Sequence, residues 1–250
     1  MKKLLSIKEL SKNYLTKKQV ICALENINLE VYENDFIALV GPSGCGKSTI
    51  LSIIGKLQKE SSGKVEFKDK NIKVGYMFQE DALFPWLTVF DNCMLGLKIQ
   101  KNVTEENKKY VKSLLKKYGL SNFEKSYPKE LSGGMRQRVA LIRTLAIKPD
   151  ILLLDEPFSA LDYQTRIAVS DDVYKIIKEE KKTAIMVTHD LEEAVSVANK
   201  VVVLSKRPAT VKNVYEIKID DELLPSKRRE DEKFKDYYNE IWKDLDHYES

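Results

Sequence analysis

The sequence predicts an α/β fold with a largely parallel central sheet. Short runs rich in β-branched residues alternate with longer stretches whose apolar residues recur at helical spacing, an order typical of βαβ units. The runs at 151–154 and 184–187 are apolar at every position, as strands covered on both faces require. Between about Ala82 and Leu131 the alternation stops and the pattern is mostly helical. We therefore expect an inserted helical subdomain over about residues 82–135.

Each expected element follows from one of these patterns. The strands are short and bounded by polar or turn-forming residues, and they are expected over Ile27–Val31, Phe36–Val40, Lys64–Phe67, Val74–Phe78, Ile151–Leu154, Thr183–Val187 and Val201–Leu204. The helices carry apolar residues three and four positions apart, and they are expected over Lys47–Leu57, Thr104–Tyr118, Gly134–Ile147, Tyr163–Glu179 and Leu191–Asn199. Residues 220–250 form an acidic tail with an amphipathic helical pattern. We expect this tail to pack on a first domain that spans residues 4–219, the alternative being a separate binding element.

The composition excludes several classes of protein. With 43% hydrophobic residues, the 250-residue chain can bury a substantial core. No apolar run approaches the roughly 18–20 residues that cross a bilayer, and the first ten residues do not resemble a signal peptide. The three cysteines, Cys22, Cys45 and Cys93, show no CxxC spacing. We interpret them as reduced thiols in a cytosolic protein.

Charge and glycine are unevenly distributed. The net charge of +4 combines −5 over residues 220–250 with +9 over residues 1–219. A basic body suits an anionic ligand or an anionic membrane surface, although it is also common on plain solvated surfaces. Only ten residues are glycine, and five of them fall in two short windows. Because glycine is needed where the backbone approaches another group closely, these windows indicate function.

The first window matches the phosphate-loop pattern G-x-x-x-x-G-K-[ST] without a mismatch, after an expected strand and before an expected helix. Glycines let successive backbone N–H groups face an anion beside the positive end of the helix. We expect Lys47 to reach the β- and γ-phosphates of a nucleotide and the Ser48 hydroxyl to bind Mg²⁺. The fold is then a P-loop NTPase core. The expected nucleotide-binding residues here are Gly41, Pro42, Ser43, Gly44, Cys45, Gly46, Lys47, Ser48 and Thr49.

Two carboxylates, Asp155 and Glu156, directly follow the apolar run at 151–154. We expect this strand to lie beside the strand that precedes the phosphate loop, so that Asp155 reaches the Mg²⁺ through a water. Glu156 would accept a proton from the water that attacks the γ-phosphate. Such a carboxylate favours hydrolysis, because a kinase must exclude water. The alternative is an acid pair at a strand end that is exposed to solvent.

The second glycine window reads Leu131-Ser132-Gly133-Gly134-Met135 and precedes an expected helix. Ser132 is a good N-cap, and the two glycines leave the first N–H groups of the helix accessible. The chain therefore holds a second helix start that favours an anion.

Along the chain the phosphate loop comes first, the second glycine window next and the acid pair last, and with these three windows the sequence resembles the ATP-binding cassette family, whose signature reads LSGGQ; here Met135 stands in the fifth position. The resemblance covers residues 4–215. It implies an ATPase that uses ATP and Mg²⁺, and an antiparallel N-terminal β subdomain beside the core. It also implies a head-to-tail homodimer, in which the signature of one subunit closes over the γ-phosphate held by the other.

The resemblance also assigns roles to single residues outside the three windows. Tyr14 would stack on adenine, Gln79 would sense Mg²⁺ and face the membrane subunits, and His189 would contact the γ-phosphate as a switch. Coupling roles would fall to Gln79, Glu130, Ser159 and Asp162. The segment from Ile72 to Val74 is shorter than is usual before the family's glutamine loop, which we interpret as a trimmed surface loop.

Met135, the run Leu83-Phe84-Pro85-Trp86-Leu87-Thr88-Val89 and the segment Ser205-Lys206-Arg207-Pro208 resemble importers of the nitrate, sulfonate and taurine type. The implied partners are two transmembrane permease subunits and an extracytoplasmic solute-binding protein, with the chain at the cytoplasmic face of the membrane and no nucleic acid bound. The solute would be of the nitrate, sulfonate or taurine kind, or a thiamine or pyrimidine precursor. The alternatives are an export-type cassette and a cassette ATPase without a membrane partner. Members of the latter class that act in DNA repair carry a coiled-coil insertion, and those that act in translation carry two cassettes, so neither fits this chain.

Overall fold

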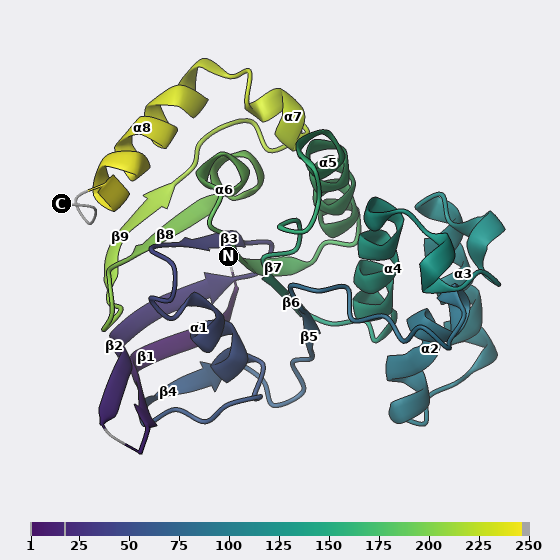
Figure 1. Cartoon of the computed structure of the whole chain (residues 1–250), viewed down its shortest axis with the longest axis horizontal. Coiled ribbons are helices and arrows are strands. Elements are labelled where there is room, and N and C mark those ends of the chain that lie inside the picture. Colours follow the sequence, from purple (N-terminus) through teal and green to yellow (C-terminus); the bar gives the residue numbers. More distant parts are fainter. Residues whose placement is uncertain (1, 18, 247–250) are drawn as a thin grey trace.

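The computed structural model describes residues 2–17 and 19–246, and a six-stranded sheet lies at its centre (Figure 1). Its strand order is β5-β6-β7-β3-β8-β9. The first five strands pair in parallel, and β9 pairs antiparallel with β8. The strands are β3 (Phe36–Val40), β5 (Val74–Met77), β6 (Ile151–Asp155), β7 (Thr183–Val187), β8 (Lys200–Leu204) and β9 (Val211–Glu216). The prediction of a mixed, largely parallel sheet is confirmed.

A second sheet is antiparallel and has the order β2-β1-β4. It consists of β1 (Lys3–Leu15), β2 (Val20–Tyr32) and β4 (Ser62–Phe67). The antiparallel N-terminal subdomain implied by the family resemblance is therefore confirmed. Single-sequence patterns did not predict β1, the first half of β2, or β9. These strands are half-exposed, and much of their surface is polar.

Helices cover both faces of the central sheet (Figure 1). α1 (Lys47–Ile54) lies between the two sheets. The opposite face carries α5 (Tyr163–Glu179), α6 (Leu191–Val197), α7 (Pro225–Arg228) and α8 (Glu232–Asp246). To one side lies a helical lobe made of α2 (Val89–Ile99), α3 (Glu105–Lys117), two short 3₁₀ turns (Ser121–Phe123 and Pro128–Glu130) and α4 (Gly133–Ala146). The predicted helices lie where expected, although α1 ends three residues early, at Ile54.

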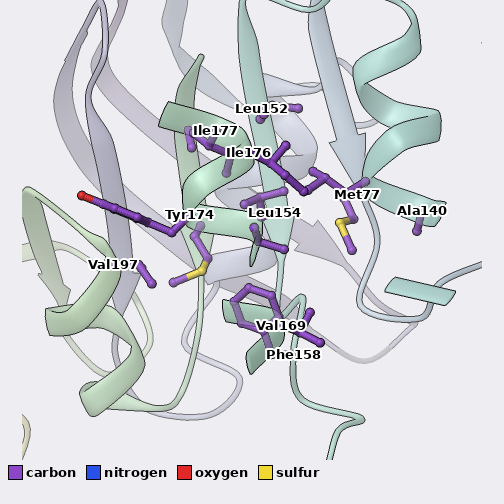
Figure 2. Close-up of a cluster of buried hydrophobic side chains, with 14 of the residues drawn as sticks. Met77, Ala140, Leu152, Leu154, Phe158, Val169, Tyr174, Ile176, Ile177 and Val197 are labelled. Carbon is purple, nitrogen blue, oxygen red and sulfur yellow. The ribbon is translucent and has the colours of Figure 1, made fainter. Parts of the chain in front are cut away.

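Successive residues of the central strands point into two different cores. Leu152 and Leu154 pack with Phe158 and Val169 in the core beneath α5 (Figure 2), whereas Ile151 and Leu153 pack against α1 and the antiparallel sheet. All four strand residues are fully buried. This confirms that the run at 151–154 is apolar throughout because both faces of its strand are covered.

The C-terminal segment runs back over the body as α8. Ile241 is fully buried, and the neighbouring half-buried aromatic residues Phe234, Tyr237 and Tyr238 pack against the same core. Residues 247–250, the end of the expected tail, lie outside the described residues. Within the described part, no helix is both long and apolar enough to cross a membrane.

Candidate functional site

The phosphate loop joins β3 to α1, as predicted. Gly46 has a φ of 127°, and a Cβ there would lie 2.7 Å from the Leu24 side chain, so only glycine fits this position. Lys47 is buried, and its Nζ donates hydrogen bonds to the carbonyl oxygens of Gly41 at 2.7 Å and Pro42 at 3.1 Å. The loop therefore curls around the lysine ammonium, beside the positive end of α1.

Asp155 lies at the end of β6 and faces the start of α1. Its Oδ1 accepts a hydrogen bond from the Ser48 hydroxyl at 2.8 Å, and its Oδ2 accepts one from the Tyr76 hydroxyl at 2.9 Å. Burial and the nearby carboxylate raise the pKa of Tyr76, so this hydroxyl stays a donor. The expectation that β6 neighbours the strand before the loop is wrong, because β7 lies between β6 and β3. Ser48 and Asp155 nevertheless meet, because both stand at the carboxyl end of the parallel sheet.

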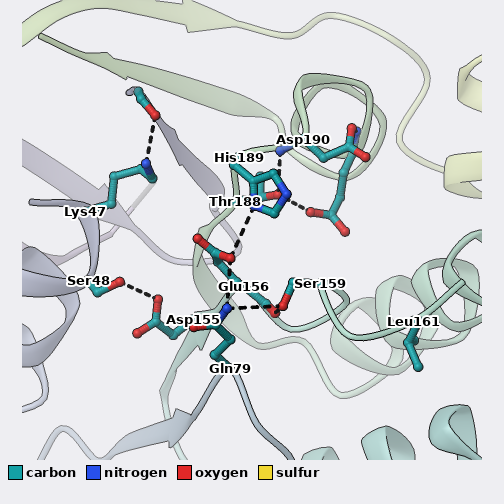
Figure 3. Close-up of polar contacts among 12 residues, drawn as sticks. Lys47, Ser48, Gln79, Asp155, Glu156, Ser159, Leu161, Thr188, His189 and Asp190 are labelled. Carbon is teal, nitrogen blue, oxygen red and sulfur yellow. Dashed lines mark hydrogen bonds and ion pairs between the residues drawn. The ribbon is translucent and has the colours of Figure 1, made fainter. Parts of the chain in front are cut away.

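Glu156 is held at the centre of a polar cluster (Figure 3). Its backbone has a φ of 44° and its N–H donates to the Val187 carbonyl oxygen at 2.9 Å. Its Oε2 lies 3.2 Å from Gln79 Nε2 and 3.2 Å from His189 Nδ1. Ser159 Oγ donates to the Glu156 carbonyl oxygen at 3.0 Å. Two segments far apart in the sequence, around Gln79 and around His189, thus meet at the carboxylate of a residue whose backbone is strained.

A pocket of about 400 Å³ opens beside the phosphate loop. Tyr14 lines it, and the Tyr14 hydroxyl lies 3.2 Å from Thr49 Oγ1 and donates to Gln58 Oε1 at 2.6 Å. The two contacts of its hydroxyl therefore hold the aromatic ring at the pocket wall. The pocket wall consists of Tyr14, Ile21, Ala23, Ser43, Gly44, Gly46, Lys47, Ser48, Thr49, Glu156 and Arg207.

The signature window lies apart from this pocket, at the start of α4. Ser132 is exposed and caps the helix by accepting a hydrogen bond from Met135 N–H at 3.3 Å. Gly134 is buried against α5, where a Cβ would lie 2.9 Å from Val169. None of the five window residues lines the pocket that the described residues form around the phosphate loop. The two helix starts that were predicted to favour an anion therefore do not share a pocket among the described residues.

Two of the expected coupling residues have clear local contacts. Glu130 Oε2 accepts a hydrogen bond from Tyr127 N–H at 2.6 Å and closes the turn before the signature. Asp162 caps α5 by accepting from Thr165 N–H at 3.1 Å, and hydrogen bonds from the Thr165 side chain and from this N–H lower the pKa of Asp162. Ser132 and Asp162 thus cap the first turns of α4 and α5, and Glu130 closes the turn that precedes α4.

Sequence patterns missed the residues that hold the loop between Gln79 and α2. Asn92 is fully buried, and its amide donates to the carbonyl oxygens of Phe84, Leu87 and Thr88 at 3.0–3.1 Å. Buried amides of this kind fix a loop because their hydrogen bonds cannot be exchanged for water. Nothing in the sequence distinguishes Asn92 from an asparagine on the solvent-exposed face of a helix, which is the more common case.

Two arginines of α4 hold the same loop from the other side. Arg136 Nε donates to Asp81 Oδ2 at 2.8 Å, and Arg143 donates to the carbonyl oxygens of Asp81 and Ala82, both at 2.7 Å. The signature helix is thereby tied to the segment that follows Gln79.

A buried acid lies beneath the loop that carries His189. Glu193 is 3% exposed, and its Oε2 accepts a hydrogen bond from the hydroxyl of Thr188. The same hydroxyl accepts from Asp190 N–H at 3.0 Å. Burial, and to a lesser extent Asp190, raises the pKa of Glu193 to about 7, against the opposing effects of the Thr188 hydrogen bond, Arg166 and Arg229. Its Oε1 has no hydrogen-bond partner among the described residues, which suits a protonated carboxyl group.

This pKa predicts a specific pH dependence of stability. Between pH 4.5 and about 7 the folded chain keeps a proton on Glu193 that the unfolded chain releases, so the free energy of unfolding falls as the pH rises. The raised pKa corresponds to a loss of about 3 kcal/mol in the free energy of unfolding by pH 8. From pH 5 to pH 8 we expect the free energy of unfolding of wild type to fall, relative to that of Glu193→Gln, by an amount of this order. Urea unfolding at both pH values measures it, with the neighbouring exposed Glu192→Gln as control; parallel wild-type and Glu193→Gln profiles would contradict the assignment.

Comparisons with known proteins agree with this geometry. A family model described as ABC transporter matches residues 24–159. The chain is 43% identical over 223 residues to an aliphatic sulfonates import ATP-binding protein of Bacillus cereus, covering 86% of each chain. It is 40% identical over 248 residues to a nitrate import ATP-binding protein of Synechocystis, covering 95% of this chain and 93% of the relative.

The fold also matches a solved cassette structure. The dimeric post-hydrolysis state of the ATP-binding cassette MJ0796, bound to ADP and Pi, superposes with a TM-score of 0.74 at 33% identity. The match covers 86% of this chain and 99% of that one. From its phosphate loop, its fold and these similarities, the chain belongs to the ATP-binding cassette family of transporter ATPases.

Proposed function

We propose that this chain is the ATP-hydrolysing subunit of an importer, working as a head-to-tail homodimer at the cytoplasmic face of the membrane. The observation that carries the proposal is the loop between Gln79 and α2, which joins the catalytic cluster to an exposed aromatic surface. Two similar proteins are named as import ATP-binding proteins, for aliphatic sulfonates and for nitrate. A solute of that class, or a thiamine or pyrimidine precursor, would enter through two permease subunits fed by a solute-binding protein.

ATP occupies the pocket beside the phosphate loop in this proposal. Tyr14 stacks on the adenine, the loop N–H groups and Lys47 bind the phosphates, and Glu156 removes the proton from the attacking water. The water oxygen then bonds to the γ-phosphorus, and the bond to the ADP oxygen breaks. Asp155 is occupied by the Ser48 and Tyr76 hydroxyls, whereas Glu156 faces Gln79 and His189. The two adjacent acids therefore have different environments and suit different tasks.

The residues present also fit Mg²⁺. Ser48 Oγ and Asp155 Oδ1 are hard oxygen donors 2.8 Å apart at the end of the phosphate loop, and no group of three or more His, Cys, Asp or Glu among the described residues could form a metal site by itself. This donor set suits a cation that takes its other ligands from phosphate and water. When bound, Mg²⁺ neutralises charge on the phosphates. Gln79 would join this group from its present contact with Glu156.

The partner surface is the tip of the loop that Asn92 and the α4 arginines hold. Trp86 is 69% exposed and Phe84 is 36% exposed, with their ring centroids 5.1 Å apart. Adjacent exposed aromatic side chains on a fixed loop are typical of a protein interface. A permease helix seated here would move with Gln79 on one side and with the signature helix on the other.

Removing these two rings should uncouple the ATPase from the membrane. We expect Phe84→Ser/Trp86→Ser to retain the ATPase rate of the isolated protein and to lose at least about tenfold in affinity for its permease, since aromatic anchors dominate interfaces. Co-sedimentation with membranes that contain the co-expressed permease measures this. Trp242→Ser, which removes a 48% exposed tryptophan from α8, is the matched control.

Co-purification separates importer from rival functions. We expect a permease and a solute-binding protein to be recovered with the detergent-solubilised complex. A cassette that exports solute would be recovered without a binding protein, and a cassette of translation or DNA repair would be recovered with ribosomes or DNA. Either result would exclude the importer proposal while leaving the ATPase activity intact.

A further inference from the structure

A second cation borders the pocket beside the phosphate loop. Arg207 lies between β8 and β9 and lines this pocket together with Tyr14 and Lys47. Its guanidinium donates a hydrogen bond to the carbonyl oxygen of Gly44, within the phosphate loop. The contact follows from topology, because β3 and β8 are parallel neighbours and both loops leave the same end of the sheet.

The loop that carries Arg207 is fixed on both sides. Ala209 is fully buried and exchanges backbone hydrogen bonds of 2.9 Å with β2, from its N–H to Ala23 and from Glu25 N–H to its carbonyl oxygen. Ser205 closes the loop internally, with its N–H bonded to the Thr210 carbonyl oxygen at 3.0 Å and its Oγ accepting from Thr210 N–H at 2.8 Å. A guanidinium held on such a loop loses little conformational entropy when it binds a ligand.

The described part of the chain does not neutralise the charge of Arg207. Among the described residues, no carboxylate lies within ion-pair distance of it, and its hydrogen bond to Gly44 uses one of five N–H donors. Arg136, Arg138 and Arg166 each pair instead with an aspartate. An exposed guanidinium with free donors, beside a loop built for phosphate, suits an anion.

We propose that Arg207 is a nucleotide-binding residue, which holds the phosphate loop at Gly44 and binds the phosphate groups of ATP and ADP. The inference rests on the proposed placement of ATP in this pocket. Arg207 thereby joins Lys47 as a second positive group on the phosphates, and its role ends at binding because, among the described residues, no hydrogen bond or ion pair joins it to Glu156, Gln79 or His189.

The test is the affinity of the purified chain for ATP, ADP and inorganic triphosphate, measured by calorimetry. We expect Arg207→Gln to weaken binding of all three by about tenfold, as loss of a charge-assisted hydrogen bond requires. The KM for ATP should rise together with the loss of affinity. Arg207→Lys keeps the charge and should recover part of the affinity. Lys206→Gln removes the same charge from the same loop, outside the pocket wall, and is the matched control.

The outcomes separate this inference from the placement of ATP. If Lys47→Ala abolishes binding while Arg207→Gln binds all three ligands as Lys206→Gln does, the Arg207 proposal is wrong and the placement stands. If Lys47→Ala binds ATP normally, the placement itself is wrong. An equal loss of affinity in Arg207→Gln and Arg207→Lys, together with a lowered melting temperature in both, would show a purely structural role and would also overturn the proposal.

Discussion

Glu156→Gln should bind ATP with nearly wild-type affinity and hydrolyse it about 10²- to 10⁴-fold more slowly, because the variant lacks the general base. The substitution keeps the size and planarity of the side chain, so the backbone at φ 44° and the Val187 hydrogen bond should persist. An amide at this position can still contact Gln79 and His189, but it cannot take a proton from water. The loss should therefore fall on kcat.

The same variant should accumulate as an ATP-bound dimer. ATP stabilises whichever state binds it more tightly, and hydrolysis is the step that would release that state. Size-exclusion chromatography with light scattering, in the presence and absence of ATP and Mg²⁺, measures the change. Glu232→Gln, an acid-to-amide change at the start of α8, is the control. A Glu156→Gln protein that hydrolyses ATP at the wild-type rate would rule out this residue as the base.

A strand could be predicted from the sequence where its own consecutive residues carry the pattern, and not where its identity depends on its neighbours in the sheet. The strands β3, β6 and β7 are buried on both faces, so four or five successive apolar residues carry the signal. β1 is instead interrupted by charged residues and by register shifts against β2. Its identity depends on pairing with β2 on one side and β4 on the other, and such non-local pairing leaves a weak local pattern. The local patterns predicted β4 and the second half of β2, and the family resemblance predicted the antiparallel subdomain to which they belong.

In the candidate site, too, the residues that are contiguous in sequence were predicted, whereas the contacts between distant segments were missed or were predicted for a wrong reason. The phosphate loop is continuous in sequence, so its glycines and Lys47 were predicted one by one. The meeting of Ser48 and Asp155 was predicted for a wrong reason, because strand order cannot be read from strand sequences and β7 intervenes. Asn92 and Arg207 act through hydrogen bonds to backbone carbonyl oxygens of other segments, and a backbone acceptor leaves no mark in the sequence.

Because the signature lies apart from the phosphate loop of the same chain, a substitution in the signature should reduce turnover without weakening ATP binding. We expect Ser132→Arg to bind ATP like wild type and to lose at least about 100-fold in turnover, a loss comparable to removing a donor that stabilises the transition state. Ser132 is exposed and lies outside the pocket wall of its own chain, so an arginine there removes the N-cap of α4 and, in the proposed dimer, would obstruct the site that a second chain completes. Thr104→Arg, which removes the equivalent cap from α3, is the control for the roughly 1 kcal/mol that a lost N-cap costs.

An experiment that mixes two variants then tests whether the phosphate loop of one chain acts together with the signature of another. Lys47→Ala has a damaged phosphate loop and an intact signature, whereas Ser132→Arg has the reverse. Each homodimer therefore has two defective sites, but a mixed dimer pairs the intact phosphate loop of one chain with the intact signature of the other. We expect the mixture to hydrolyse ATP faster than the sum of the two separate proteins, with a maximum near equal concentrations. If the mixed rate equals that sum at every ratio, while light scattering shows that mixed dimers form, the signature and the phosphate loop do not build a composite site in this protein.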